Sequence, residues 1–168
     1  MNFKTSGRRG KKEKLPLLKL IKNDCLIFES EMSDVELKIE SNVNAEIFFE
    51  CWEQDIYSIF TNLVENSLYW MRQKQGMKKI ISIYVSISDE DVDFIEYRDT
   101  GPGIDSKLIK SEIIFEPGYS TKETNRDGQK SKGTGLGLCI AGEAALRCGW
   151  VLEAKESNSG AYFKLRTK

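Results

Sequence analysis

The stretch Gly133-Thr134-Gly135-Leu136-Gly137-Leu138 decides the fold of this chain. Its three alternating glycines lie where a polar segment, Ser120 to Lys132, gives way to an apolar segment with helical spacing. Glycine lets backbone N–H groups come close to an anion, and the free N–H groups of a first helical turn favour phosphate. A glycine-rich helix entry is also a common plain turn, so these six residues alone leave both interpretations open.

Three further segments precede the glycine stretch in a fixed order. The first has a helical pattern, the second follows a predicted strand, and the third opens the polar segment. They are Asn62-Leu63-Val64-Glu65-Asn66, Asp99-Thr100-Gly101-Pro102-Gly103-Ile104 and Ile114-Phe115-Glu116-Pro117-Gly118-Tyr119-Ser120-Thr121-Lys122. Together the four segments resemble the asparagine box, first glycine box, phenylalanine box and second glycine box of the GHKL ATPase superfamily. Within it, residues 15–168 look most like the catalytic ATP-binding domain of sensor histidine kinases.

Length and composition predict a single domain, because 168 residues with 40% hydrophobic content can bury one sizeable core. The four cysteines (Cys25, Cys51, Cys139 and Cys148) form no C-x-x-C pair and the chain has no histidine, so we expect reduced, mostly buried thiols rather than a zinc site or disulfides. The chain contains neither an apolar run of about 18 residues nor a secretory signal. We therefore expect a soluble, cytoplasmic chain, and a full-length protein that is free to carry a membrane anchor upstream.

The charge of the chain is uneven. Residues 1–14 hold six basic residues and one acidic residue, a net charge of +5, so the remainder accounts for −6 of the overall −1. We interpret residues 1–14 as a basic linker or a tag-derived lead-in, and a basic arm that touches nucleic acid or a membrane is the alternative. The acidic remainder argues against a nucleic-acid-binding face, so nucleic acid is not an expected partner.

Hydrophobic periodicity predicts an α+β fold. We expect helices at about 15–31, 55–75 and 136–148, and strands at about 35–40, 46–52, 79–88, 92–98, 150–154 and 162–166. Asp55 is the expected N-cap of the second helix and Gly76 its expected stop. The sum is a two-layer α/β sandwich with a mixed, mostly antiparallel sheet of about five strands covered on one face by helices. This is the Bergerat fold that the resemblance implies.

The helix at 55–75 places Asn62 and Asn66 on one flank, off its apolar stripe. An amide oxygen is a neutral ligand suited to Mg²⁺, which takes the rest of its shell from water and phosphate oxygens. Taken alone, these side chains would be solvated asparagines. The resemblance implies instead that Asn66 coordinates Mg²⁺ and that Asn62 is its partner one turn earlier.

Position 62 also bears on the reaction. Hydrolysing relatives such as the Hsp90, MutL and gyrase B proteins carry a glutamate there as a general base, whereas this chain has Asn62. The resemblance therefore implies phosphoryl transfer to another acceptor, with the domain positioning ATP and neutralising charge. We expect Glu65 to be a solvated acid. It is the candidate base of the alternative function, a GHKL ATPase that drives a conformational switch or a partner interaction. A nucleotide-sensing module without turnover is a third possibility.

The first glycine box carries the expected adenine contacts. The resemblance implies that the Asp99 carboxylate accepts a hydrogen bond from the exocyclic amine of adenine, which would select ATP over GTP. Gly101, Gly103 and Ile104 would then bring the backbone close to the nucleotide. Trp70 stands where the family tends to place an adenine-stacking aromatic, and a core tryptophan is the competing interpretation.

Residues 115–132 are expected to form a mobile lid, with Phe115 and Tyr119 anchoring one end, because the small and charged side chains of this segment bury too little area to offset ordering. Tyr69 replaces a basic residue that histidine kinases commonly carry, so we expect Lys122 to supply the missing phosphate contact. The other predicted phosphate-side residues are Thr121, Gly133, Thr134, Gly135, Leu136, Gly137 and Leu138.

The absence of histidine limits the reaction, because a histidine kinase phosphorylates a histidine on a helical dimerisation domain. We interpret the chain as a fragment that follows such a domain, and a protein acting on a separate partner is the alternative. The expected ligands are ATP and Mg²⁺. The expected protein partners are a histidine-bearing dimerisation domain of the same full-length protein and a response regulator. The isolated chain is expected to be a monomer and the full-length protein a homodimer.

Overall fold

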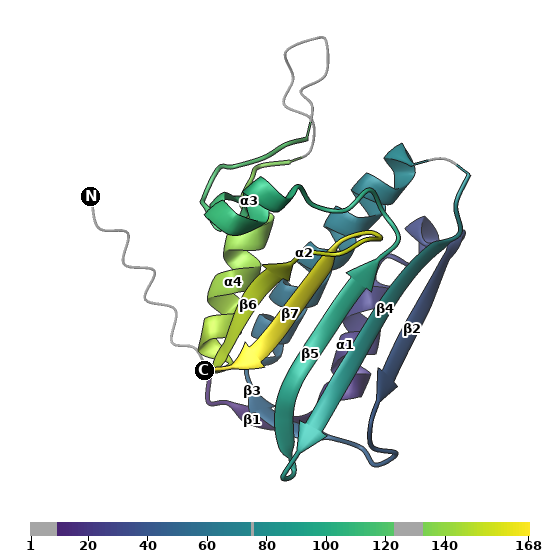
Figure 1. Cartoon of the computed structure of the whole chain (residues 1–168). Helices are drawn as coiled ribbons and strands as arrows, with labels where there is room; N and C mark the ends of the chain where they lie inside the picture. Colours follow the sequence, from purple (N-terminus) through teal and green to yellow (C-terminus); the bar gives the residue numbers. More distant parts are fainter. Residues whose placement is uncertain (1–9, 75, 123–132) are drawn as a thin grey trace.

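The computed structural model describes residues 10–74, 76–122 and 133–168. Figure 1 shows a two-layer sandwich in which helices lie against one face of a twisted sheet. In the described residues this sheet has five strands in the order β2-β4-β5-β7-β6, with β2 and β4 parallel and the other pairs antiparallel. The strands are β2 (Val35–Ser41), β4 (Lys79–Ser88), β5 (Asp91–Asp99), β6 (Trp150–Lys155) and β7 (Tyr162–Thr167). The expected mixed, mostly antiparallel sheet is confirmed.

Helices α1 (Leu17–Leu26), α2 (Glu53–Gln73) and α4 (Gly137–Arg147) form the second layer, with α2 packed between the other two. The apolar stripe of α2 is buried because residues three and four apart face the sheet. Its members include Ile56, Ile59, Phe60, Leu63 and Leu68. The helix α4 packs on α2, and its Ala141 and Ala144 side chains are buried. None of the helices in the described part of the chain is long and apolar enough to cross a membrane.

Short elements that periodicity did not predict lie beside the end of β5. They are the helix α3 (Ser106–Ser111) and the 3₁₀ turn η2 (Ile113–Phe115). Elements of six and three residues are too short to show a 3.6-residue pattern. Asp105 caps α3, because its Oδ1 accepts a hydrogen bond from the Lys107 backbone N–H at 2.7 Å.

The first predicted helix, 15–31, was wrong at both ends. Residues Glu13–Pro16 form the strand β1, which pairs antiparallel with β3 (Phe48–Cys51) in a separate two-stranded sheet. The helix therefore begins at Leu17, and it ends at Leu26 before a 3₁₀ turn, η1 (Glu29–Glu31). The pairing partner of β1 is distant in sequence, so the local pattern could not reveal it.

The predicted N-cap of the second helix was also wrong. Trp52 is the N-cap of α2, and Asp55 lies within the first helical turn with 2% of its surface exposed. The Arg147 side chain on α4 donates from Nε to Asp55 Oδ1 at 2.8 Å. Asp55 therefore ties two helices together instead of capping one. Gly76 does follow the end of α2, in a left-handed conformation with φ of +79°.

The residues just before β1 are attached to the domain. Lys12 Nζ donates to the Arg147 carbonyl oxygen at the end of α4, at 3.1 Å, and lies 4.9 Å from the centre of the Trp52 ring. Trp52 in turn donates from Nε1 to the Gly10 carbonyl oxygen at 2.6 Å. Gly10 and Lys12 thus contact the N-cap residue of α2, and Lys12 also contacts the last residue of α4.

The cysteines are free thiols, and three of them are buried, as expected: Cys25, Cys51 and Cys148. Burial, reinforced by the nearby carboxylates of Asp24 and Asp55 respectively, raises the pKa of Cys25 and of Cys148 to about 12. These thiols stay protonated at neutral pH, which suits packing and not nucleophilic chemistry.

Candidate functional site

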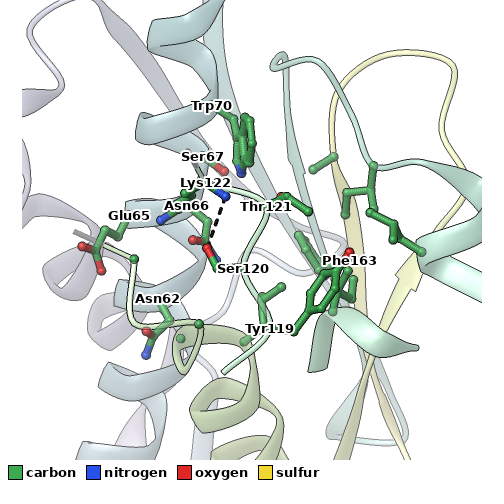
Figure 2. Close-up of a pocket in the computed structure, with 18 of the residues that line it drawn as sticks. Asn62, Glu65, Asn66, Ser67, Trp70, Tyr119, Ser120, Thr121, Lys122 and Phe163 are labelled. Carbon is green, nitrogen blue, oxygen red and sulfur yellow. Dashed lines mark hydrogen bonds between the residues drawn. The ribbon is translucent and has the colours of Figure 1, made fainter. Parts of the chain in front are cut away.

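A cleft of about 420 Å³ lies where α2, the end of β5 and the start of α4 meet. Most of the predicted site residues contribute to its wall, although they come from segments far apart in the sequence. They are Asn62, Glu65, Asn66, Trp70, Asp99, Gly103, Ile104, Thr121, Lys122, Gly133, Thr134, Gly135, Gly137 and Leu138. The four sequence boxes are therefore brought together in space around one cavity, and Figure 2 shows this wall.

Three predicted residues lie outside the wall of the cleft. Gly101 is behind Asp99 and donates its N–H to that carboxylate. Phe115 is half-buried and packs against the hydrophobic core. Leu136 is the N-cap of α4, with 40% of its surface exposed. These three positions support their neighbours and do not face the cavity.

Asp99 lies on the wall of the cleft, with 7% of its surface exposed. Its Oδ1 accepts hydrogen bonds from the backbone N–H groups of Gly101 and Ala161, each at 2.9 Å. Its Oδ2 accepts a hydrogen bond from the Ser67 hydroxyl at 2.6 Å. Three donors from three different segments thus hold one carboxylate in place.

Some wall residues were missed by sequence reasoning, among them Ser67 and Phe163. Ser67 belongs to the apolar stripe of α2, and a hydroxyl buried in such a stripe needs a hydrogen-bond partner. That requirement was the available signal. Gly160 was also missed. Its φ is +72°, and a Cβ there would lie 1.7 Å from the Asp99 carbonyl oxygen. The end of β5 can therefore come this close to residue 160 only because that residue is glycine.

The alternating glycines are explained by close approach. Gly135 has φ of +68°, and its carbonyl oxygen accepts from the Gly118 N–H at 3.0 Å. A Cβ at Gly135 would lie 2.5 Å from the Gly118 backbone, and a Cβ at Gly137 would lie 2.8 Å from Asn62 Oδ1. The stretch thus packs against the asparagine-bearing helix on one side and the phenylalanine-box segment on the other.

The two asparagines differ in their bonding. Asn62 donates from Nδ2 to the Ser58 carbonyl oxygen one turn earlier, at 2.7 Å, so its Oδ1 faces Gly137. Asn66 lies on the cleft wall, to which Ser120 and Lys122 also contribute, and Figure 2 labels all three. Glu65 is exposed, as expected of a solvated acid, and in Figure 2 its carboxylate points away from Tyr119 and Phe163.

Lys122 stands at the rim of the cleft over α2. Its Nζ lies 4.7 Å from the centre of the Tyr69 ring, a cation–π contact. Partial burial lowers the pKa of Lys122, and the Glu65 carboxylate opposes that shift. A Cβ at Gly133 would lie 2.8 Å from Lys122 Cδ, so the two ends of the polar segment meet. The expected lid, 115–132, is described only as far as Lys122, and residues 123–132 lie outside the described residues.

Trp70 is half-buried on the cleft wall and is not a core residue. Its ring meets the Tyr69 ring edge to face, with 5.0 Å between the ring centres. Figure 2 shows it on the same side of the cleft as Ser67. One aromatic face is therefore available at the Asp99 end of the cavity.

Comparison with known proteins gives two curated relatives. The sensor protein CitS of Halalkalibacterium halodurans is 35% identical over 107 residues, which cover 62% of this chain and 18% of that protein. The sensor protein kinase PilS of Pseudomonas aeruginosa is 31% identical over 85 residues, which cover 51% of this chain and 14% of that protein. The chain thus spans less than a fifth of the length of either relative.

Solved structures share the fold. The catalytic domain of histidine kinase ThkA superposes with a TM-score of 0.73 at 22% identity, covering 94% of this chain and 95% of that one. ThkA in complex with the response regulator TrrA gives a TM-score of 0.69 at 19% identity, covering 93% of this chain and 41% of that one. The fold is that of a histidine kinase catalytic domain.

The family model described as histidine kinase-, DNA gyrase B- and HSP90-like ATPase matches residues 53–168. This range begins at the first residue of α2 and contains every box that lines the cleft. Because the match covers more than half of the chain, it shows the family and supports the use of a nucleotide. The chain belongs to the family of histidine kinase-, DNA gyrase B- and HSP90-like ATPases.

Proposed function

We propose that this chain is the catalytic domain of a two-component sensor kinase. It holds Mg²⁺-ATP in the cleft and donates the γ-phosphoryl group to a histidine on a dimerisation domain that lies outside this sequence. The observation that carries the proposal is the shared cavity. Its wall contains a buried carboxylate that accepts three hydrogen bonds, a lysine and an alternating-glycine stretch.

The chemistry of the wall fits a purine nucleotide with its phosphates. The cavity volume falls in the range of ligand pockets, about 300–1,000 Å³. Asp99 offers an anionic acceptor for an exocyclic amine, and Trp70 offers a stacking surface beside it. Lys122 and the backbone around Gly135 offer the positive charge and N–H groups that phosphates need.

The residues also fit a magnesium ion that is bound mainly through phosphate. Asn66 would supply its amide oxygen, the neutral hard donor that Mg²⁺ accepts beside phosphate and water. When bound, the ion would neutralise charge that develops on the transferring phosphoryl group. Asn66 would hold the ion, and Lys122 would steady the phosphates.

The asparagine at position 62 favours transfer to a protein acceptor over hydrolysis. A hydrolytic site needs a general base close to the attacking water. Asn62 carries an amide where a general base would carry a carboxylate, and this amide donates to the Ser58 carbonyl oxygen. Glu65 is exposed and is the one remaining acid of the asparagine box. This arrangement positions ATP without activating water.

The partners follow from the same proposal. The acceptor would be a histidine-bearing dimerisation domain of the same full-length protein, and the next recipient would be a response regulator. The isolated chain would be a monomer and the full-length protein a homodimer, working in the cytoplasm. Residues 1–14 would be the linker or lead-in, and residues 15–168 the ATP-binding domain with its lid at about 115–132.

The test is to measure steady-state phosphate release by this chain with Mg²⁺-ATP, and fluorescent-nucleotide binding in the same sample. We expect an occupied site with negligible release, and phosphorylation of the dimerisation domain of the full-length protein when that domain is added. Sustained release that disappears in Glu65→Gln, but persists in the control Glu40→Gln on β2, would establish the ATPase alternative instead. An empty site under all conditions would overturn both.

A further inference from the structure

Three buried side chains, linked by hydrogen bonds, extend from the core of the domain to the cleft. The Tyr97 hydroxyl on β5 donates to Ser67 Oγ at 2.9 Å, and the Ser67 hydroxyl donates to Asp99 Oδ2 at 2.6 Å. Tyr97 is completely buried, and Ser67 has 2% of its surface exposed. These hydrogen bonds therefore join α2 to two positions of β5, and Asp99 at their outer end lines the cleft.

Tyr97 sets the direction in which these two hydrogen bonds are donated. Burial raises the pKa of Tyr97 well above its usual value, and the nearby Asp99 carboxylate adds to the effect. Tyr97 consequently keeps its proton and acts as the donor. The Ser67 hydroxyl has one proton, and with Tyr97 donating to its oxygen that proton is directed at Asp99.

Counting acceptor sites on Asp99 shows which oxygen is open to a ligand. Each carboxylate oxygen has about two lone-pair sites. Both sites of Oδ1 are used by the backbone N–H groups of Gly101 and Ala161. One site of Oδ2 is used by Ser67, so the site that remains on Oδ2 is the one available in the cleft.

We propose that Ser67, supported by Tyr97, is a positioning residue for base selection: it fixes the orientation of Asp99 so that the open site of Oδ2 accepts the exocyclic amine of adenine. The proposal rests on the proposed nucleotide site and adds to it the atom that reads the base. A base with a carbonyl oxygen in place of the amine would face a fixed, negatively charged acceptor, which it cannot satisfy.

The experiment compares ATP with inosine triphosphate, whose base has a carbonyl oxygen in place of the exocyclic amine and a proton on the neighbouring ring nitrogen. Their dissociation constants are measured by calorimetric titration for the wild-type chain and for Ser67→Ala, Ser67→Thr, Tyr97→Phe and Thr61→Val. We expect the wild-type chain to favour ATP. Ser67→Ala is expected to reduce that preference by about tenfold, because the carboxylate can then turn or bind water.

The conservative variants separate positioning from packing. Ser67→Thr keeps the hydroxyl and is expected to keep the preference. Tyr97→Phe leaves Ser67 in place without its donor and is expected to reduce the preference by about twofold to threefold. Thr61→Val removes another buried hydroxyl of α2, one that donates to the Tyr57 carbonyl oxygen at 2.6 Å, and is expected to leave the preference unchanged.

The outcomes distinguish this proposal from the nucleotide site itself. A wild-type chain that binds neither nucleotide would overturn both. A wild-type chain that prefers ATP, together with an unchanged preference in Ser67→Ala and Tyr97→Phe, would overturn the positioning role and leave the site intact. If Ser67→Ala does not fold, an unchanged preference in Tyr97→Phe overturns the proposal and a reduced one supports it.

Discussion

Asp99 and Asp24 are buried to the same extent, each with 7% of its surface exposed, yet their surroundings are opposite. Asp99 accepts three hydrogen bonds and lines the cleft. Asp24 lies on α1, and its Oδ2 has no hydrogen-bond partner among the described residues. Burial, with a smaller contribution from the Glu53 carboxylate on α2, raises the pKa of Asp24 to about 7.

The comparison shows that burial alone does not make a carboxylate functional. Donors that compensate the lost hydration allow a charged form to persist at a cavity, and this is what a binding site needs. Without donors, the same carboxyl group becomes a proton-binding group that weakens the fold when it ionises. Three predictions test this contrast, from the largest expected effect to the smallest.

Changing Gly160 to alanine would break the Asp99 environment. The new Cβ would lie 1.7 Å from the Asp99 carbonyl oxygen, at a left-handed backbone position. We expect the free energy of unfolding to fall by about 4 kcal/mol. Gly149→Ala is the matched control, because Gly149 is also left-handed but has no heavy atom within 4 Å of the added Cβ, and it should cost about 1–2 kcal/mol. Urea unfolding measures both, and equal losses would contradict the steric explanation.

Changing Asp24 to asparagine would remove the group without donors. The folded-state pKa of Asp24, about 7, lies above the ordinary value of 3.8, so the folded state binds more protons between these limits. Its contribution to stability is fully present below about pH 4 and is lost as the pH rises through 7. We expect Asp24→Asn to be more stable than wild type by about 2–3 kcal/mol at pH 8 and to match it near pH 4.

Urea unfolding between pH 4 and pH 8 measures this difference. The wild-type chain should lose stability relative to Asp24→Asn as the pH rises. A constant difference across the range would show that Asp24 does not titrate in this window, and the contrast with Asp99 would then fail.

Changing Asp99 to asparagine tests the comparison of Asp99 with Asp24 through the affinity for ATP. We expect ATP binding to weaken by about 1.5–3 kcal/mol, because a charge-assisted hydrogen bond is lost. Asp24→Asn should leave the affinity unchanged, since Asp24 does not line the cleft. Calorimetric titration of both variants with Mg²⁺-ATP measures this, and a similar loss in the two would remove Asp99 from its special role.

Much of the fold was predictable because its main elements have strong local patterns. The long apolar stripe of α2 and the alternation in β4 and β5 identify the central elements. The boxes predicted most of the cleft wall, since glycine spacing and amide positions are local features. The predicted helix start at residue 15 was wrong because β1 pairs with a strand more than thirty positions later.

Other features depend on partners that no local pattern contains. Asp55 has the sequence character of an N-cap, but Arg147, 92 positions away, bonds its side chain. Ser67 looks in the sequence like a small residue that packs within an apolar stripe, but its hydroxyl forms hydrogen bonds with Asp99 and Tyr97. In both cases the tertiary fold supplies a hydrogen-bond partner that the helix alone cannot.

The attachment of Lys12 to the end of α4 has a mechanical consequence. The helix has eleven residues, about 16 Å of rigid rod. Its far end carries the Arg147 carbonyl oxygen that Lys12 contacts, its near end presents Gly137 to Asn62, and the buried alanines between them rest on α2. A displacement of the backbone at residue 12 would therefore act on the same helix whose first residue lies against Asn62 at the cleft.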